Sequence, residues 1–516
     1  MNKIQNFAQI IRLIAVSCCF FFGSCTEREL SEKDKAPIEY VDPFMEKQSL
    51  AWENSIRELK ESVPAPEIPL LGLPFGQTHW TFQNSPDYKD CLGDFSYPMD
   101  SILSIRPTHW NLKRCFADYG TFKLRLGNQS KDKSFPFRAQ ALNKDFGGPV
   151  SFQGNLPELN STLEFAISSR SALFQLNSLK KDTLVLGISP HTSSSYTKIN
   201  FYPASGEIWV QDSMPALFPG LNMYYLIQTN NIYTGYGIWQ ARLKEPKETQ
   251  LISTNPDAGF YIEFPLDSSE SLQFKIAGSY WDLQDARLHL KKEIPDWDIA
   301  GVKERGRASW EELLGRISIE QKDQISPQEI QNFYQSLFWA SLVPRTFSGT
   351  DGLYPSFSGE RIPERKESGN FYGDLSMWEN GNSPQEKFLH LLFPENKEDI
   401  HFSKEHDAIR PSSDLDSSGF GGGNMNLAEK ASLEVLRYLG LKALDTDVEY
   451  LGLQKPVFTS WVLNKAKPNE FQFSCDCPAE GSAGVSSVTF NGKKLENLKI
   501  KISDILQGGK LEVICE

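Results

Sequence analysis

The chain has 516 residues, a formal net charge of −13 and a hydrophobic fraction of 40%. This length predicts at least two domains, and the hydrophobic fraction is sufficient for large buried cores. The negative charge argues against nucleic acid as a partner and against direct binding of anionic membrane surfaces.

Residues 1–24 form a predicted targeting segment, which does not belong to the fold. A short apolar run, 13–23, ends just before Cys25. Small residues ahead of a cysteine resemble a bacterial lipoprotein signal, although Phe22 replaces the usual aliphatic residue. The alternatives are an ordinary secretory signal and a transmembrane anchor, for which the run is short. We therefore expect lipidation of Cys25, anchoring in the bacterial cell envelope (outer membrane or cell surface) and a polar tether over 25–39.

The region 40–298 reads as one large β-sandwich. Short runs of alternating apolar and polar residues recur there between Gly, Pro, Asn and Ser, for example at 122–126, 162–167 and 206–210. Such alternation at regular spacing is typical of strands in two packed sheets. Aromatic residues make up 12% of the chain. They fit either a sandwich core or surfaces that stack against sugars, and most buried aromatics belong to a core.

The period of the apolar residues becomes helical in the linker region, 299–325. Charged residues separate the apolar positions, which predicts an amphipathic linker helix. Its apolar face comprises Ile299, Val302, Trp310, Leu313 and Leu314.

A helical region follows over 326–440. Ser326 is an expected N-cap, with Pro at the first helical position and Glu at the third. A second helix is expected over 426–439, and Gly440 would end it. A barrel of a dozen helices needs roughly 250–350 residues. The region 326–440 is far shorter than that.

The segment 441–516 returns to β-strands, expected at 486–490 and 510–514, with a tight turn at Asn491 and Gly492.

Five cysteines follow Cys25 in the body of the chain. Their odd number leaves at least one thiol unpaired in an oxidising compartment. Cys475 and Cys477 are too close in sequence for an ordinary bridge, and they lack partners at zinc-site spacing, so the sequence predicts no metal site. The five are Cys91, Cys115, Cys475, Cys477 and Cys515.

Short motifs follow one another in a characteristic order along most of the chain. They are Tyr40–Phe44, Leu73–Gly76, Thr108–His109, Ala117–Gly120, Ser279–Arg287, Glu293–Asp298, Phe333–Tyr334, Ser376–Glu379, Ser487–Lys493 and Asp504–Gly509. In this order and spacing they resemble glycoside hydrolase family 92, the calcium-dependent exo-acting α-mannosidases. The resemblance extends over the chain except for roughly 395–420.

This resemblance implies a sandwich that faces an (α/α)6-type helical barrel, with both lining the pocket. The fold class is therefore a multidomain β plus α chain: a large N-terminal β-sandwich, a linker helix, a shortened remnant of the helical domain over 326–440 and a C-terminal β segment. The resemblance also implies an inverting mechanism, with two carboxyl groups about 6.5–9.5 Å apart. A calcium ion held by oxygen ligands is expected in the family.

The sequence departs from the family where catalysis would take place. The positions of the catalytic base hold Met425 and Asn426, and Asn426 makes sense as an N-cap. Only residues 394–423 join the flanking motifs, so the general acid and the calcium ligands are expected to be missing. After Trp378, the family's aspartate is replaced by Glu379. We therefore assign no catalytic residue, metal ligand or cofactor.

An acidic loop offers one alternative, a rebuilt catalytic or metal site, because paired carboxylates can do acid–base work when burial separates their pKa values. Acidic loops are usually only solvated, and solvation is the simpler interpretation here. The loop carries His401, Glu405, His406, Asp407, Asp414 and Asp416.

The leading hypothesis is a lipid-anchored relative of the α-mannosidases that has lost catalysis and binds mannose-containing glycans or has a structural role. The residues expected near a sugar are His109, Asp118, Trp378 and Glu379. A buried hydrogen bond is the alternative for His109 and Asp118, and a core position is the alternative for Trp378. An active α-mannosidase with a reorganised site and a gene shortened by deletion are the competing interpretations.

Overall fold

The computed structural model describes most of the chain after the predicted leader. The described residues are 35–45, 68–85, 95, 97–110, 112, 118–128, 137–192, 196–213, 222–240, 243–355, 361–363, 371–373, 384–393, 427–444, 447, 449–477 and 484–516. Cys25 and the predicted leader lie outside these residues. Within them, no helix combines the length and the apolar character that crossing a membrane requires.

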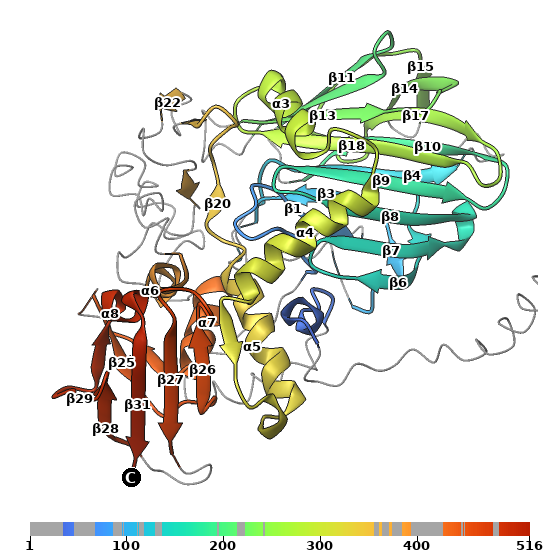
Figure 1. Cartoon of the computed structure of the whole chain (residues 1–516). Helices are drawn as coiled ribbons and strands as arrows, with labels where there is room; N and C mark the ends of the chain where they lie inside the picture. Colours follow the sequence, from blue (N-terminus) through green and yellow to red (C-terminus); the bar gives the residue numbers. More distant parts are fainter. Residues whose placement is uncertain are drawn as a thin grey trace, which may run out of the picture.

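Two large antiparallel sheets form the N-terminal part of the molecule (Figure 1). The first has seven strands in the order β1 (His79–Gln83), β3 (Ser104–Thr108), β4 (Phe122–Asn128), β10 (Asp182–Pro190), β17 (Gly259–Leu266), β14 (Gly235–Gln240) and β15 (Leu243–Pro246). The second has nine in the order β16 (Gln250–Ser253), β11 (Tyr196–Tyr202), β12 (Glu207–Ser213), β13 (Asn222–Thr229), β18 (Ser271–Ser279), β9 (Ser171–Ser178), β8 (Ser161–Ile167), β7 (Ser151–Leu156) and β6 (Asn143–Gly147).

Buried aromatic rings fill much of the space between these sheets. Phe174 on β9 lies opposite Phe274 on β18 in the strand register, and their ring centroids are 4.9 Å apart. Phe165 on β8 stacks on the other side of Phe174, also at 4.9 Å. All three rings are fully buried. These phenylalanines therefore serve the core, the first of the two roles considered for the aromatic residues.

Two helices cover the outer face of the nine-stranded sheet, α3 (Leu283–Glu293) and α4 (Ile299–Leu314) (Figure 1). Small and branched side chains of the sheet, including Ala166 and Ala277, pack against Leu290 of α3 and Val302 of α4. The predicted linker helix is confirmed as α4. Helix α3 was not predicted, because its sequence lies within the region assigned to the sandwich. Asp282 caps it by accepting a 2.8 Å hydrogen bond from the backbone N–H of Asp285.

Three helices lie in the described part of 326–440: α5 (Pro327–Ala340), α6 (Pro384–Leu392) and α7 (Leu427–Tyr438). The predicted start of α5 is confirmed, because Ser326 and Glu329 form a reciprocal capping box. The predicted stop is confirmed too: Gly440 has a φ of 72°, the left-handed conformation that favours glycine after a helix. Helix α7 packs against both α5 and α6.

Strands of the C-terminal segment join β19 (Ile317–Ile319), which directly follows α4, in a six-stranded sheet. Its order is β19, β26 (Ser460–Leu463), β27 (Phe471–Asp476), β31 (Gly509–Cys515), β28 (Val485–Phe490) and β29 (Lys493–Lys494). A smaller sheet contains β24 (Leu441–Ala443), β25 (Tyr450–Leu453) and β30 (Lys499–Lys501), followed by α8 (Ile502–Gln507). The predicted turn joins β28 to β29, with φ of 49° at Asn491 and 77° at Gly492. Two successive positive φ values are typical of a type I′ hairpin turn.

Candidate functional site

Asp118 lies just before β4 and is buried within the sandwich. Its carboxylate forms an ion pair with the buried guanidinium of Arg106 on β3. It also accepts hydrogen bonds from the Thr108 hydroxyl (2.6 Å) and from the backbone N–H groups of His109 (2.9 Å) and Tyr119 (2.8 Å). This set of bonds fastens the turn before β4 to the end of β3.

His109 is fully buried beside this carboxylate. Its Nδ1 lies 2.9 Å from the carbonyl oxygen of Tyr119, which can only accept, so Nδ1 carries the hydrogen. The Thr78 hydroxyl then donates to Nε2 over 3.3 Å. Burial, and next the positive charge of Arg345, lower the pKa of His109 to about 3. The imidazole is therefore neutral at physiological pH.

The pKa of Asp118 reflects opposing effects. Burial raises this pKa. The Arg106 guanidinium and the hydrogen bonds to the carboxylate together lower it by more, so the net shift is downward. The described contacts of His109 and Asp118 are with groups of the protein itself, as the hydrogen-bonding alternative predicts. Their contact with a sugar stays a prediction. Trp378 and Glu379 lie outside the described residues, as do Met425, Asn426 and the acidic loop.

Arg345 joins the helical region to the same end of the sandwich. It lies on β20 (Arg345–Thr346), which pairs with β23 (Tyr372–Gly373). Its side chain is fully buried and donates a hydrogen bond to the carbonyl oxygen of Trp110. Sequence patterns gave no signal for this residue, because an isolated arginine in a short strand has no characteristic spacing.

The motif at 279–287 also connects the sandwich to the helical region. Ser279 donates a 2.8 Å hydrogen bond to Asp285, and the Thr350 hydroxyl donates to the other oxygen of that carboxylate over 3.3 Å. About two helix turns further along α3, Glu293 accepts hydrogen bonds from the Arg170 backbone N–H (2.9 Å) and guanidinium (3.2 Å). Glu293, the first residue of the next motif, thereby holds Arg170 at the junction.

A pocket of about 380 Å³ lies where the sandwich, the linker helix and the helical region meet. Ligand sites in proteins are often of this size and often lie between domains. The sandwich contributes Leu73, Pro74, Phe75, Ser169 and Arg170; α4 and the residues after it contribute Ser309, Glu312, Leu313 and Arg316; and the helical region contributes Thr346, Tyr372 and Phe393.

Aromatic rings form one side of this interdomain pocket. The rings of Phe75 and Phe393 meet edge to face with centroids 4.5 Å apart, and Tyr372 lies 5.9 Å from Phe75. The Arg316 guanidinium lies over the Phe393 ring at 4.9 Å. Phe75 has a φ of 53°, a backbone strain that is uncommon for a bulky side chain and recurs at functional sites.

The lining residues suit a polar ligand with one apolar face. Two guanidinium groups, Arg170 and Arg316, provide hydrogen-bond donors, and the exposed Glu312 provides an acceptor. An inverting glycosidase needs two carboxyl groups on opposite faces of the sugar. Among the described residues that line the pocket, Glu312 alone carries a carboxylate. This described lining can bind a sugar but does not supply an acid–base pair.

No cluster of three or more His, Cys, Asp or Glu side chains in the described part of the chain offers oxygen ligands for calcium. There, the one group of three or more His, Cys, Asp or Glu side chains close enough to hold a metal ion comprises Cys475, Cys477 and Cys515. Calcium takes oxygen ligands, so these sulfur atoms do not fit it. The segment 394–423, to which the loss of calcium ligands was assigned, lies outside the described residues.

Comparison with known proteins identifies similar sequences and folds. Residues 40–279 match the sequence profile of the glycosyl hydrolase family 92 N-terminal domain, and residues 285–408 match that of the family's catalytic domain. No curated protein sequence matches the chain.

Solved structures extend the likeness to nearly the whole fold. An inverting mannosidase of family GH92 from Bacteroides thetaiotaomicron VPI-5482 has a TM-score of 0.74 at 12% identity, over 94% of this chain and 97% of that one. A GH92 α-mannosidase from Bacteroides thetaiotaomicron has a TM-score of 0.70 at 11% identity, over 93% and 94% of the two chains. At such low identity the likeness concerns the fold, and it confirms the predicted fold class.

Proposed function

Because this chain belongs to glycoside hydrolase family 92, we propose that it is a catalytically degenerate, lipid-anchored member that binds mannose-containing glycans without hydrolysing them. The ligand would occupy the interdomain pocket, with its apolar face toward Phe75 and Tyr372. Arg170, Arg316 and Glu312 would bind its hydroxyl groups.

The composition of the pocket lining carries this proposal. Aromatic faces and charged hydrogen-bonding groups together suit a sugar ring, which has apolar C–H faces and a polar edge. Glu312 is the one carboxylate among the described lining residues, whereas inversion requires two. The departures at Met425 and Asn426 support the same conclusion, because neither side chain accepts a proton as a carboxylate does.

The proposed ligand, a mannose-containing glycan, is inferred from what is known of similar proteins. A GH92 α-mannosidase from Bacteroides thetaiotaomicron is known in complex with mannoimidazole. The lipid anchor rests on the sequence around Cys25 and would place the glycan-binding body at the cell envelope.

Two measurements on the body without its leader test the proposal. A glycan array, run with and without calcium, should show binding to glycans with terminal mannose. An assay with an α-mannoside at high protein concentration should release no mannose. Release of mannose that chelation abolishes would instead establish an active α-mannosidase with a reorganised site. Absence of binding to any glycan would leave only a structural role.

A further inference from the structure

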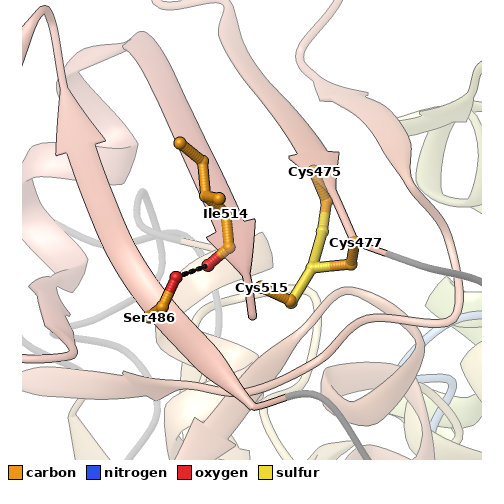
Figure 2. The surroundings of a disulfide bond; sticks show 5 residues. All are labelled: Cys475, Cys477, Ser486, Ile514 and Cys515. Carbon is orange, nitrogen blue, oxygen red and sulfur yellow. Dashed lines mark hydrogen bonds between the residues drawn. A yellow bond between two sulfur atoms is a disulfide. The ribbon is translucent and has the colours of Figure 1, made fainter. Parts of the chain in front are cut away.

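Three cysteines meet at the end of the C-terminal sheet. Cys475 lies near the end of β27, Cys477 directly follows that strand, and Cys515 is the last residue of β31 (Figure 2). Their sulfur atoms all lie within 4.8 Å of one another. The sequence could not reveal this cluster, because parallel pairing of the two strands brings together residues that are 38 positions apart.

The strand register explains why the three side chains converge. Cys475 lies opposite Val513 and Asp476 lies opposite Ile514, so the next step along the two strands places Cys477 opposite Cys515. Residues two apart on a strand share a face, which directs Cys475 and Cys477 toward the same side. Asp476 between them is directed to the other face.

Cys477 lies between two possible bonding partners. Its sulfur is close enough to form a disulfide with either Cys475 or Cys515, and Figure 2 shows it drawn to both. The Cα–Cα separations are 5.6 Å for Cys475–Cys477 and 4.7 Å for Cys477–Cys515. Both lie in the range that disulfides span. The backbone therefore permits a Cys475–Cys477 bridge, which the sequence spacing argued against, as well as a Cys477–Cys515 bridge.

Valence allows only one of these bonds at a time. We propose that the three cysteines form a thiol–disulfide exchange site, in which Cys477 alternates between Cys475 and Cys515 and the third residue is a thiol. In one direction the Cys515 thiolate attacks the sulfur of Cys477. The Cys477–Cys515 bond forms as the Cys475–Cys477 bond breaks. Cys475 leaves as a thiolate and takes up the proton that Cys515 lost, so no net oxidation occurs.

The surrounding backbone holds all three residues in place whichever bond exists. Glu516 and Gly484 exchange two backbone hydrogen bonds of 3.1 and 3.2 Å, and these fix the end of β31. The Ser486 hydroxyl donates to the carbonyl oxygen of Ile514 over 3.1 Å, as Figure 2 shows. The backbone N–H of Cys475 donates to Thr459 over 2.7 Å. An unbonded thiol therefore stays beside the bridge that it can attack.

The two outer thiols differ in their access to solvent. Cys475 is half-buried, whereas Cys515 is buried, with 7% of its surface exposed. A reagent in solution should therefore react faster with Cys475. The first bridge requires a two-electron oxidant, and a small-molecule disulfide such as glutathione disulfide can provide it.

Peptide-resolved labelling of the purified full chain, oxidised with glutathione disulfide, tests the exchange. An acid quench followed by fast alkylation records which thiol is free at equilibrium. Slow alkylation at neutral pH with limiting reagent allows exchange to continue. Tryptic fragments 466–493 and 511–516 separate Cys515 from the other two, and cleavage before Asp476 separates Cys475 from Cys477.

Exchange predicts one labelled thiol per cluster, on Cys475 or Cys515, with little label on Cys477. The fraction of the label found on Cys475 should be several-fold higher after slow alkylation than after the acid quench, because exchange replenishes the exposed thiol. Equal shares in both protocols would show a fixed bridge and overturn the proposal. So would label on all three residues, or a stoichiometric zinc or copper ion that protects all three until it is removed.

Three variants provide matched controls. C475S should hold the Cys477–Cys515 bridge with no free thiol in the cluster, and C515S should hold the Cys475–Cys477 bridge. C477S should leave both remaining thiols free, because a two-residue offset between neighbouring strands places their Cα atoms roughly 8 Å apart. Efficient bridging in C477S would contradict the central role of Cys477. The wild-type comparison does not depend on any variant folding.

Discussion

Thr346 donates two hydrogen bonds to the carbonyl oxygen of Phe75, one from its backbone N–H (2.9 Å) and one from its hydroxyl (2.8 Å). Phe75 belongs to the sandwich side of the interdomain pocket and Thr346 to the helical side. In return, the N–H of Phe75 donates to Ser341 over 3.0 Å. These bonds hold the strained backbone of Phe75 and close the pocket at the junction.

Replacement of Thr346 by valine tests this closure. The substitution keeps the shape but removes the buried hydroxyl, which should lower the free energy of unfolding by about 1 kcal/mol. Chemical denaturation measures this loss, and the same change at the exposed Thr192 is the control. Equal stability of the two variants would mean that the hydroxyl bond contributes nothing to the junction.

Replacement of Arg316 by methionine tests the pocket. The variant keeps an apolar stem over Phe393 but loses the guanidinium. Affinity for a mannose-containing glycan should fall about tenfold, the loss expected for one charge-assisted hydrogen bond. Calorimetric titration gives the affinity. The matched control, Arg305→Met, changes an exposed arginine of α4 outside the lining and should bind as the wild type does.

Replacement of Asp118 by asparagine tests the buried ion pair. The variant leaves the Arg106 guanidinium buried beside a neutral group, which should cost about 3–5 kcal/mol of stability. Urea denaturation measures it, and Asp100→Asn at an exposed position should be nearly neutral. A loss below about 1 kcal/mol would show that Arg106 does not depend on this carboxylate.

The lowered pKa of His109 predicts a pH dependence. Between the unfolded value of 6.5 and the folded value of about 3, the unfolded chain binds a proton that the folded chain does not. The free energy of unfolding should therefore fall as pH falls through this window, by up to about 1.4 kcal/mol per pH unit from this group. His79 and His289, whose pKa values are also lowered by burial, should act in the same direction.

Denaturant titrations between pH 4 and 7 measure that slope, and the His109→Gln variant should flatten it. The lowered pKa of Asp118 acts at more acidic pH: its stabilising contribution is complete above the unfolded value of 3.8 and is lost as pH falls through the lower folded value. An unchanged slope in His109→Gln would mean that His109 titrates alike in both states.

The two bridges at Cys477 should stabilise the chain unequally. Their loops span 38 residues for Cys477–Cys515 and two for Cys475–Cys477. The chain-entropy estimate favours the longer loop by roughly 2 kcal/mol. Cys515→Ser should therefore lower the stability of the oxidised C-terminal sheet, and Cys475→Ser should preserve it. Thermal unfolding with and without reductant compares them, and equal effects would argue against the longer bridge.

Local signals in the sequence predicted much of the fold. The N-cap at Ser326 and the hairpin turn at Asn491 and Gly492 depend on residues that are close together in sequence. Their positions can therefore be predicted from the local sequence alone. Helix α3 escaped prediction because its short sequence follows a strand without a clear helical period. The family motifs at 73–76 and 279–287 indicated important segments but not their role at the junction.

The site depended on long-range contacts and was largely unpredicted. Arg170 and Arg316 come from unrelated segments and meet Tyr372 only through domain packing. His109 and Asp118 were expected near a sugar from the motifs that contain them; both are buried in the sandwich, and their contact with a sugar stays a prediction. Spacing along the chain carries no information about which of these side chains reaches the pocket.

The position of β31 has a consequence for biosynthesis. This strand follows all the other strands of the six-stranded sheet in sequence, yet it lies inside the sheet, between β27 and β28. The other strands of that sheet leave the ribosome earlier and must wait with unpaired edges. The sheet also includes β19, which directly follows the linker helix. The six-stranded sheet can therefore become complete only after residues 509–515 have been translated, although its first strand, β19, is made almost two hundred residues earlier.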